Sequence, residues 1–303
     1  MPIAIVVHGG AGTLLPERRA AVEAGCKEAA QAGWRVLQAG GSALDAVEAA
    51  VRVLEDDPNF NAGRGACMTM NGTIELDAGI MDGNTLNVGA VAVVERIKNP
   101  ISLARKVLES EHVLLNGKGA ERFAAEHNIP SCTYDDLLTE RQYQLWKTRN
   151  DADEPRFYRR EFRPTVREEK HGTVGAVALD ASGALAAATS TGGIHYKYPG
   201  RVGDSPLVGC GFYADEYAAI SCTGHGEDFT RLLIAKRAAD YVAGGVVARD
   251  AASATIAFLG AHAKGTGGLI VVDRLGNAGF AWNSANMTHA YITEGMAEPT
   301  AGA

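Results

Sequence analysis

The sequence predicts an α+β layered fold, in which antiparallel sheets are covered by helices. The first half mixes short apolar strands with two helix-like segments, a highly charged stretch follows, and the second half contains hairpin patterns separated by helices. A doubly wound parallel sheet would alternate strands and helices more strictly. With 303 residues, 46% of them apolar, the chain is long enough to bury a sizeable core.

Apolar spacing predicts the elements of the first half. Residues 3–7 form a β-branched apolar run, which predicts a buried strand. Apolar residues at helical spacing predict a helix over 17–39, and Ser42 is a good N-cap for a second helix over 43–55, which Pro58 ends. We expect further strands at residues 68–70, 74–76 and 88–94, and helices at 103–108 and 119–127.

A charged stretch separates the two halves. Residues 151–170 contain twelve charged residues of balanced sign and two prolines. A segment of this composition has too few apolar residues to fold by itself. We therefore predict a mobile linker over about 138–170, with an exposed charged helix as an equal alternative for residues 138–150.

Hairpin patterns dominate the second half. Residues 173–179 and 184–189 predict two strands joined by a turn at 180–183. We expect another strand pair at 208–214 and 218–222, helices at 229–243 and 251–259, and a final hairpin formed by 269–273 and 278–282. The whole chain, residues 1–303, is expected to form one domain.

Composition excludes several classes of function. The net charge of −7 argues against nucleic acid as a partner. The cysteines are widely spaced and form no C-x-x-C motif, which favours a reducing compartment over disulfides or a zinc site: Cys26, Cys67, Cys132, Cys210 and Cys222. No apolar stretch approaches the ~18 residues of a membrane span, and the first residues lack the features of a signal peptide. We expect a cytoplasmic location and no membrane partner.

The glycine-rich turn at His8 allows one non-catalytic interpretation. A predicted strand precedes it and a helix follows, as in dinucleotide-binding folds. However, His8-Gly-Gly-Ala-Gly does not have the G-x-G-x-x-G spacing. The G-x-S-x-G, H-E-x-x-H and P-loop motifs are absent from the sequence. A nucleotide- or ligand-binding protein that uses this turn is kept as an alternative.

The Gly172-Thr173 pair, which follows the charged stretch, carries the clearest sign of chemistry. If the chain were cut there, Thr173 would gain an α-amine with a pKa near ~7.7–8.0, which can act as a general base. An N-terminal threonine activated by its own amine is a known type of nucleophile. Glycine tolerates a strained backbone and lets the hydroxyl reach the preceding carbonyl. On the dipeptide alone, the simple start of a strand is the better interpretation.

The surrounding segments change that balance, because the chain resembles plant-type asparaginases and isoaspartyl peptidases, which are N-terminal-nucleophile hydrolases. The matching segments are HGGAGT (8–13), FNAGRGA (60–66), ELDAGIMDGNTLNVGAVA (75–92), GTVGAVALD (172–180), ATSTGG (188–193), PGRVGDSPLVG (199–209), SCTGHGE (221–227) and GGLIVVD (267–273). They occur in order along almost the whole chain. The resemblance implies a four-layer αββα sandwich, self-cleavage into an α chain (1–172) and a β chain (173–303), and pairing of cut chains as (αβ)2.

The resemblance also assigns catalytic roles. Thr173 matches the nucleophile, Thr191 a threonine whose hydroxyl bonds to it, and Asn61 a polar residue beside it. Without the resemblance, Thr191 would be a strand-end residue and Asn61 a turn residue. Thr223 and Gly224 match the oxyanion hole, which supplies donors where negative charge develops.

Three further positions match a site for a free amino acid. Arg201 matches the residue that binds the α-carboxylate, Asp204 the anchor of the α-ammonium and Gly226 a nearby backbone contact. A surface ion pair is the alternative for Arg201 and Asp204. The implied activity is hydrolysis of L-asparagine and β-aspartyl dipeptides through a β-aspartyl ester. A glycosylasparaginase or a taspase-like threonine hydrolase on the same fold is the alternative.

The resemblance implies no cofactor for the chemistry but a structural sodium ion after the second helix. Main-chain carbonyls would bind it, and oxygen ligands suit a hard alkali cation. The matching positions are Leu54, Glu55, Asp57, Phe60, Ala62 and Arg64. Arg64 departs from the family pattern, in which we expect a smaller or apolar residue, and this leaves the substrate range open.

Overall fold

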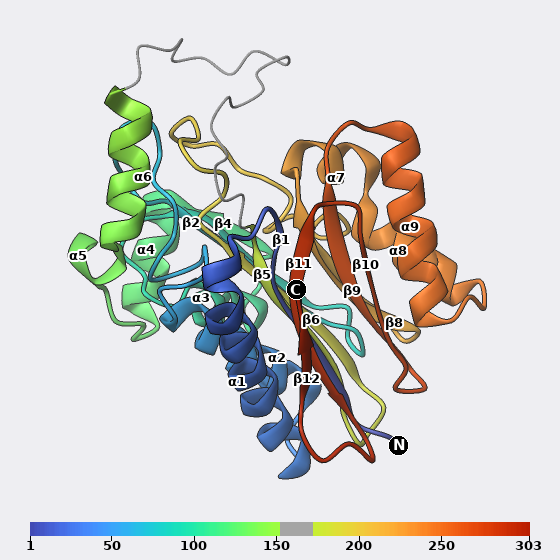
Figure 1. Ribbon diagram of the computed structural model, residues 1–303. Helices are drawn as coiled ribbons and strands as arrows, with labels where there is room; N and C mark the ends of the chain where they lie inside the picture. The colour runs from blue at the N-terminus through green and yellow to red at the C-terminus, as the bar shows by residue number, and fades with distance from the viewer. Residues whose placement is uncertain (152–171) are drawn as a thin grey trace.

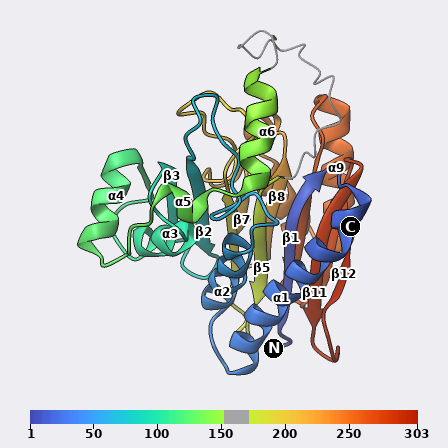
Figure 2. The ribbon, with the colours of Figure 1, turned by 60° about the vertical axis from the view of Figure 1, so that its left-hand side comes forward.

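The computed structural model describes residues 1–151 and 172–303. Two sheets pack face to face, and helices cover the outer face of each sheet (Figures 1 and 2). The predicted four-layer αββα sandwich is therefore confirmed. Within the described ranges, no helix is long and apolar enough to cross a membrane.

The larger sheet contains the strands that carry the N-terminus and Thr173. Its strands are β1 (Ala4–Gly12), β2 (Leu76–Asp82), β3 (Val88–Val94), β4 (Leu114–Asn116), β5 (Val174–Leu179), β6 (Leu185–Thr191), β11 (Asn286–Thr293) and β12 (Thr300–Gly302). Their order is β12-β11-β1-β5-β6-β2-β3-β4, and only β3 and β4 run parallel to each other. The strand β5 therefore lies between β1 and β6, at the centre of the sheet.

The smaller sheet comes entirely from the C-terminal part of the chain. Its strands are β7 (Phe212–Ala214), β8 (Ala218–Gly224), β9 (Gly267–Asp273) and β10 (Ala278–Trp282), in the order β10-β9-β8-β7. All seven residues of β9 are buried, because the larger sheet covers one face and helices cover the other. This explains why β9 reads as a continuous apolar run.

Helices from the first half of the chain cover the larger sheet, and helices from the second half cover the smaller sheet. On the larger sheet lie α1 (Arg19–Gln38), α2 (Ala43–Asp56), α3 (Pro100–Leu108) and α4 (Gly117–Glu126), whereas α8 (Ile234–Ala243) and α9 (Ala248–His262) lie on the smaller sheet. The short segments are η1 (Pro16–Arg18), α5 (Tyr134–Leu137) and α7 (Gly226–Leu232). The Ser42 hydroxyl accepts from the Asp45 N–H at 3.1 Å, which confirms the predicted N-cap of α2.

Among the described residues, three apolar cores correspond to the three contacts between layers. The first lies between α1–α4 and the larger sheet and contains Leu54. The second lies between the two sheets and includes Val177 and Phe212. The third lies between the smaller sheet and its helices and includes Ile220 and Leu259. The central strand β5 contributes side chains to the first two cores, which fixes its position on both faces.

Several predicted elements differ from the structure. Residues 68–75 form a turn rather than two strands, with Gly72 at φ +81°. The predicted helix over 229–243 is interrupted at Leu233, whose φ is +50°. Strands β11 and β12 were not predicted at all. The strand β11 pairs with β1, so a contact between the two ends of the chain stabilises it.

The predicted linker begins with a helix. Residues Glu140–Asp151 form α6, as the alternative of a charged helix proposed, and its Gln142 amide donates to Gly65 O at 2.7 Å. The Trp146 ring packs against Gly72. The rest of the predicted linker, 152–171, lies outside the described residues.

The turn at His8 belongs to a strand rather than to a strand–helix junction. Residues His8 to Gly12 continue β1, and the pairing with β11 shifts between His8 and Gly10, as in a β-bulge. A dinucleotide-binding turn would instead open a helix. The geometry of this motif therefore does not match a dinucleotide-binding turn.

Candidate active site

Thr173 lies at the start of the central strand β5 and is buried. Its hydroxyl oxygen lies 3.0 Å from the hydroxyl oxygen of Ser205. The last pair of the β5–β6 ladder is Val174 with Ser190, so Thr173 and Thr191 face each other one position further along. The candidate nucleophile thus directly precedes a fully buried central strand.

The backbone of Gly172 passes very close to the bulge in β1. A Cβ atom on Gly10 would lie 2.7 Å from Gly172 N and 2.9 Å from Gly172 O, and Gly10 has φ +111°. Both facts require glycine at this position. The conformation of the His8–Gly12 segment therefore lets the predicted cleavage site lie against β1.

The Thr223 hydroxyl lies next to Gly172 and to Ala11 of β1. Its Oγ1 accepts from the Ala11 N–H at 3.1 Å, and a Cβ on Gly172 would lie 2.6 Å from it. Because the oxygen already accepts a hydrogen bond, the hydroxyl hydrogen remains to be donated. Gly224 follows at the end of β8. This arrangement suits a donor to an oxyanion formed near Gly172.

Thr191 and Asn61 both contact Gly193, directly after β6. The Thr191 hydroxyl accepts from the Gly193 N–H at 2.9 Å, and the Asn61 amide donates to Gly193 O at 2.7 Å. Both side chains thus fix the turn that ends β6. In the uncut chain the Thr173 hydroxyl pairs with Ser205, and a direct bond between Thr173 and Thr191 stays a prediction for the cut enzyme.

Arg201, Asp204 and Gly226 come together, although Gly226 belongs to a different element. A Cβ on Gly226 would lie 2.8 Å from an Arg201 guanidinium nitrogen and 3.0 Å from Asp204 Oδ1. A Cβ on Gly203 would lie 2.8 Å from another nitrogen of the same guanidinium. Both glycines therefore pack directly against this positive–negative pair, where a side chain would clash with the charged groups. Because Ser205 follows Asp204 directly and contacts Thr173, the pair adjoins the candidate nucleophile.

The Asp204 carboxylate has an unusual environment. It is buried, and its Oδ2 has no hydrogen-bond partner among the described residues. Burial raises the pKa of Asp204 to about 7, although the Arg201 charge opposes this rise. A buried acceptor without a partner is unfavourable, and a ligand ammonium would satisfy it. This supports a cation-binding role for Asp204.

Two residues of the site were not singled out from the sequence. Glu227 accepts from Arg201 Nε at 2.9 Å and from its Nη2 at 2.7 Å, so a carboxylate already occupies the guanidinium fork. The Nε and Nη2 groups of Arg201 thus form a bidentate pair with a carboxylate of the protein itself. Ser205, the partner of Thr173, is the other. Both lie inside matched segments, next to Gly226 and Asp204, but no sequence signal distinguished them from their neighbours.

The predicted cation ligands lie in the last turn of α2 and the loop after it. Glu55 O accepts from the Arg64 N–H at 2.8 Å, and the Arg64 side chain itself is exposed. Gly65, at φ +97°, would place a Cβ 2.7 Å from both Phe60 O and Pro58 O. Gly65 thus lets the chain pass close to these two carbonyl oxygens, of which that of Phe60 is a predicted ligand. This arrangement fits a hard cation bound by main-chain oxygens.

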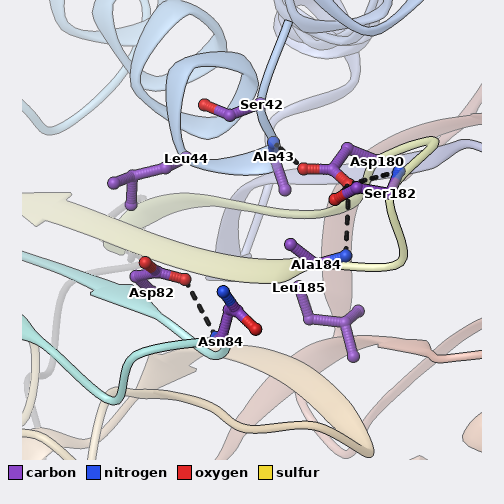
Figure 3. A pocket seen from close by; sticks show the side chains of 9 residues that line it. All are labelled: Ser42, Ala43, Leu44, Asp82, Asn84, Asp180, Ser182, Ala184 and Leu185. Atoms are coloured by element: carbon purple, nitrogen blue, oxygen red, sulfur yellow. Dashed lines mark hydrogen bonds between the residues drawn. The ribbon is translucent and has the colours of Figure 1, made fainter.

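A hollow of about 250 Å³ lies away from these residues (Figure 3). It is found where β5 ends, at the opposite end of that strand from Thr173. Its Asp180 carboxylate accepts from the backbone N–H groups of Ala43, Ser182 and Ala184. Asp180 therefore has a structural role at the N-terminus of α2 and in the β5–β6 turn, and the hollow is not the candidate site.

Comparison with known proteins gives matches over nearly the whole chain. The model of a family described as asparaginase matches residues 1–301. The chain is 47% identical over 308 residues to the plant-type L-asparaginase of Pyrococcus horikoshii, covering 99% of both chains. It is 45% identical over 302 residues to the isoaspartyl peptidase/L-asparaginase of Mus musculus, covering 97% of this chain and 89% of the relative. For the human protein of that name the identity is 43% over 297 residues, covering 97% of this chain and 94% of the relative.

Proposed function

Because the chain belongs to the asparaginase family, as the match over residues 1–301 establishes, we propose that it hydrolyses L-asparagine and β-aspartyl dipeptides with Thr173 as nucleophile. One observation carries the proposal. Thr173 Oγ1 lies 3.0 Å from Ser205, the direct neighbour of the Arg201–Asp204 pair. A nucleophile beside a paired cation and anion fits an amino-acid substrate with free α-groups.

The chain must first be cut between Gly172 and Thr173. The Thr173 hydroxyl attacks the Gly172 carbonyl carbon, and the acyl group moves from nitrogen to oxygen. This shift breaks the Gly172–Thr173 C–N bond and frees the amine of Thr173. Water then hydrolyses the ester, which releases the carboxylate of Gly172 and restores the Thr173 hydroxyl. The Thr223 hydroxyl, which lies against Gly172, is placed to donate to the oxygen that becomes negative.

The cut enzyme would use the same groups on its substrate. The Thr173 oxygen attacks the side-chain carbonyl carbon of the substrate while the α-amine of Thr173 takes the hydroxyl proton. Thr223 and the Gly224 N–H stabilise the oxyanion. The C–N bond then breaks, and the leaving ammonia or amino acid receives that proton. Water hydrolyses the β-aspartyl ester, and aspartate leaves.

A substrate panel tests this assignment. Purified protein should release aspartate from L-asparagine and from β-aspartyl dipeptides. Faster hydrolysis of a short N-glycosylated asparagine than of either substrate would favour the glycosylasparaginase alternative. Cut chains are expected to pair as (αβ)2, which light scattering of the eluted enzyme tests.

The pKa of Asp204 predicts a pH-dependent clamp. Since Asp204 titrates at about 7, lowering the pH from 8 to 6 neutralises it, and the neutral form binds an ammonium poorly. Glycine carries only the two α-groups, so its inhibition constant reports on the clamp without side-chain effects. The constant should rise by up to about tenfold per pH unit below 7.

Two comparisons sharpen that measurement. N-acetylglycine lacks the ammonium and should inhibit weakly without this dependence, and the Asp204→Asn variant should show a flat profile for glycine. An inhibition constant for glycine that is unchanged between pH 5 and pH 8 in the wild type would contradict the ammonium-binding role of Asp204.

We also propose that the loop after α2 holds a sodium ion through the carbonyls of the six predicted residues, and that the ion stabilises this loop. An ion that binds only the folded chain adds about 2.7 kcal/mol of stability at 100 times its dissociation constant. Tm should therefore fall by several degrees when tetramethylammonium chloride replaces sodium chloride at equal ionic strength. Returning sodium should restore it, whereas equal Tm values in the two salts would argue against the site.

A further inference from the structure

Lys197, which approaches Gly193 together with Arg201, belongs to a second group of charged side chains that the proposed mechanism does not use. Glu75, Asp77 and Lys197 are all buried, and Lys197 has no exposed surface at all. A charged group in the protein interior is strongly unfavourable unless it is paired and hydrogen-bonded. The contacts of Lys197 and Glu75 therefore show which parts of the backbone these buried charges hold in place.

Lys197 contacts Glu75 through one hydrogen bond and one ion pair. Its ammonium donates to the main-chain oxygen of Glu75 at 3.0 Å and lies 3.7 Å from the Glu75 carboxylate. The backbone of Lys197 is also fixed, because its carbonyl accepts from the Met70 N–H at 2.9 Å. Both the side chain and the backbone of Lys197 are therefore held in place, directly before the loop that carries Arg201.

The Glu75 carboxylate reaches into that loop. Its two oxygens lie 3.1 and 2.9 Å from Gly200 N and accept its N–H. The Arg201 N–H donates to Tyr198 O at 2.9 Å, and Gly200 has φ +82°. With Pro199 at the second position and Gly200 at the third, these residues form a type II turn. Glu75 therefore holds the turn at the residue before Arg201.

Gly193 connects Lys197 with the Arg201 side chain. A Cβ on Gly193 would lie 3.2 Å from Lys197 Nζ and 3.5 Å from an Arg201 guanidinium nitrogen. Two positive charges on either side of one glycine repel each other in a low-dielectric interior. Glu75 supplies a negative charge next to Lys197, and Asp77 is buried in the adjoining strand β2. The position of the Arg201 guanidinium thus depends on the charges of Lys197, Glu75 and Asp77.

We propose that Glu75 and Lys197 act together as positioning residues that fix the Tyr198–Arg201 turn and hold Arg201 toward the α-carboxylate of the substrate. The inference rests on the proposed function, in which Arg201 binds that carboxylate. Neither residue touches the substrate in this account. Their effect is on the orientation of Arg201, and a shift of about 1 Å in such a group can lower kcat/KM about 100-fold.

Three variants test the pair: Glu75→Gln, Lys197→Met and the double variant. Glu75→Gln keeps an oxygen for the Gly200 N–H but leaves Lys197 without its counter-charge, and Lys197→Met does the converse. Each cut single variant should raise KM for L-asparagine roughly 10- to 100-fold, with kcat changed less than about threefold. The preference for L-asparagine over its α-amide should fall by the same factor.

The double variant tests whether the two residues act as a unit. It removes both charges and leaves neither unpaired, so its loss should be smaller than the product of the two single losses. The surface pair of Lys106 on α3 and Glu109 directly after it, at 2.8 Å, provides the matched control. Lys106→Met and Glu109→Gln make the same chemical changes there and should leave KM and the preference unchanged.

The outcomes distinguish the binding role of Arg201 from the positioning role of Glu75 and Lys197. If the wild type hydrolyses L-asparagine and its α-amide equally well, the clamp assigned to Arg201 in the proposed function is wrong. If the wild type discriminates and the cut single variants keep its KM and its preference, only the positioning role is overturned. Equal loss of kcat on both substrates, or a double variant that is not cut, would show a general structural role and also overturn it.

Discussion

Replacing Thr173 with alanine should leave one uncut chain of 303 residues without detectable hydrolase activity. The variant lacks the hydroxyl that attacks Gly172 in maturation and the substrate carbonyl in turnover. Loss of a covalent nucleophile lowers turnover by at least about 10⁴-fold. A denaturing gel and an assay of aspartate release measure both effects.

Two further variants make this result specific. Thr173→Ser keeps a hydroxyl and should still be cut. Thr255→Ala removes another buried threonine hydroxyl, which donates to Ala251 O at 2.7 Å in α9, and should be cut and active like the wild type. Two fragments from Thr173→Ala, still divided at 172/173, would refute cleavage by this hydroxyl.

Replacing Arg201 or Asp204 with alanine should lower kcat/KM for L-asparagine by roughly 30-fold to several thousand-fold. Loss of one partner of a buried charged contact costs about 2–5 kcal/mol, because the other charge is left unpaired, and about 1.4 kcal/mol corresponds to a factor of ten. Arg201→Lys should restore only part of the loss, since an ammonium cannot form the bidentate contact.

Blocked substrates show which group each residue binds. The α-amide of L-asparagine should be a poor substrate of the wild type and should lose little more in Arg201→Ala, and the N-acetyl form should behave in the same way with Asp204→Ala. Arg122→Ala, which breaks a surface pair with Glu126 on α4, is the control. Cutting must be verified for every variant. Equal hydrolysis of all three compounds by the wild type would contradict the clamp.

Local sequence patterns were sufficient for most of the fold but not for its long-range pairs. Helices α1 and α2 and strands β5, β6 and β9 follow from apolar spacing and turn residues within each segment. The strand β11 mixes polar and apolar residues, and pairing with β1 at the other end of the chain stabilises it. The break between α7 and α8 falls at Leu233, where the backbone adopts φ +50° in a non-glycine residue. Because no glycine or proline stands there, the sequence gives no sign of the break.

The site could be predicted only where residues match a known motif. The structure places Thr173 beside Thr223 and, through Ser205, next to Arg201, Asp204 and Gly226, and the roles of these residues stay predictions. The contacts between loops were not predictable. Glu227 in the fork of Arg201 depends on how α7 meets the Arg201 loop, and chain order does not encode such a contact.

The most direct test of the account is the mass of the purified wild-type protein under denaturing conditions, combined with sequencing of any new N-terminus. The account predicts two polypeptides from one gene, the second of 131 residues beginning with Thr173. An intact 303-residue chain that hydrolyses L-asparagine, or an active enzyme cut at another bond, would contradict it.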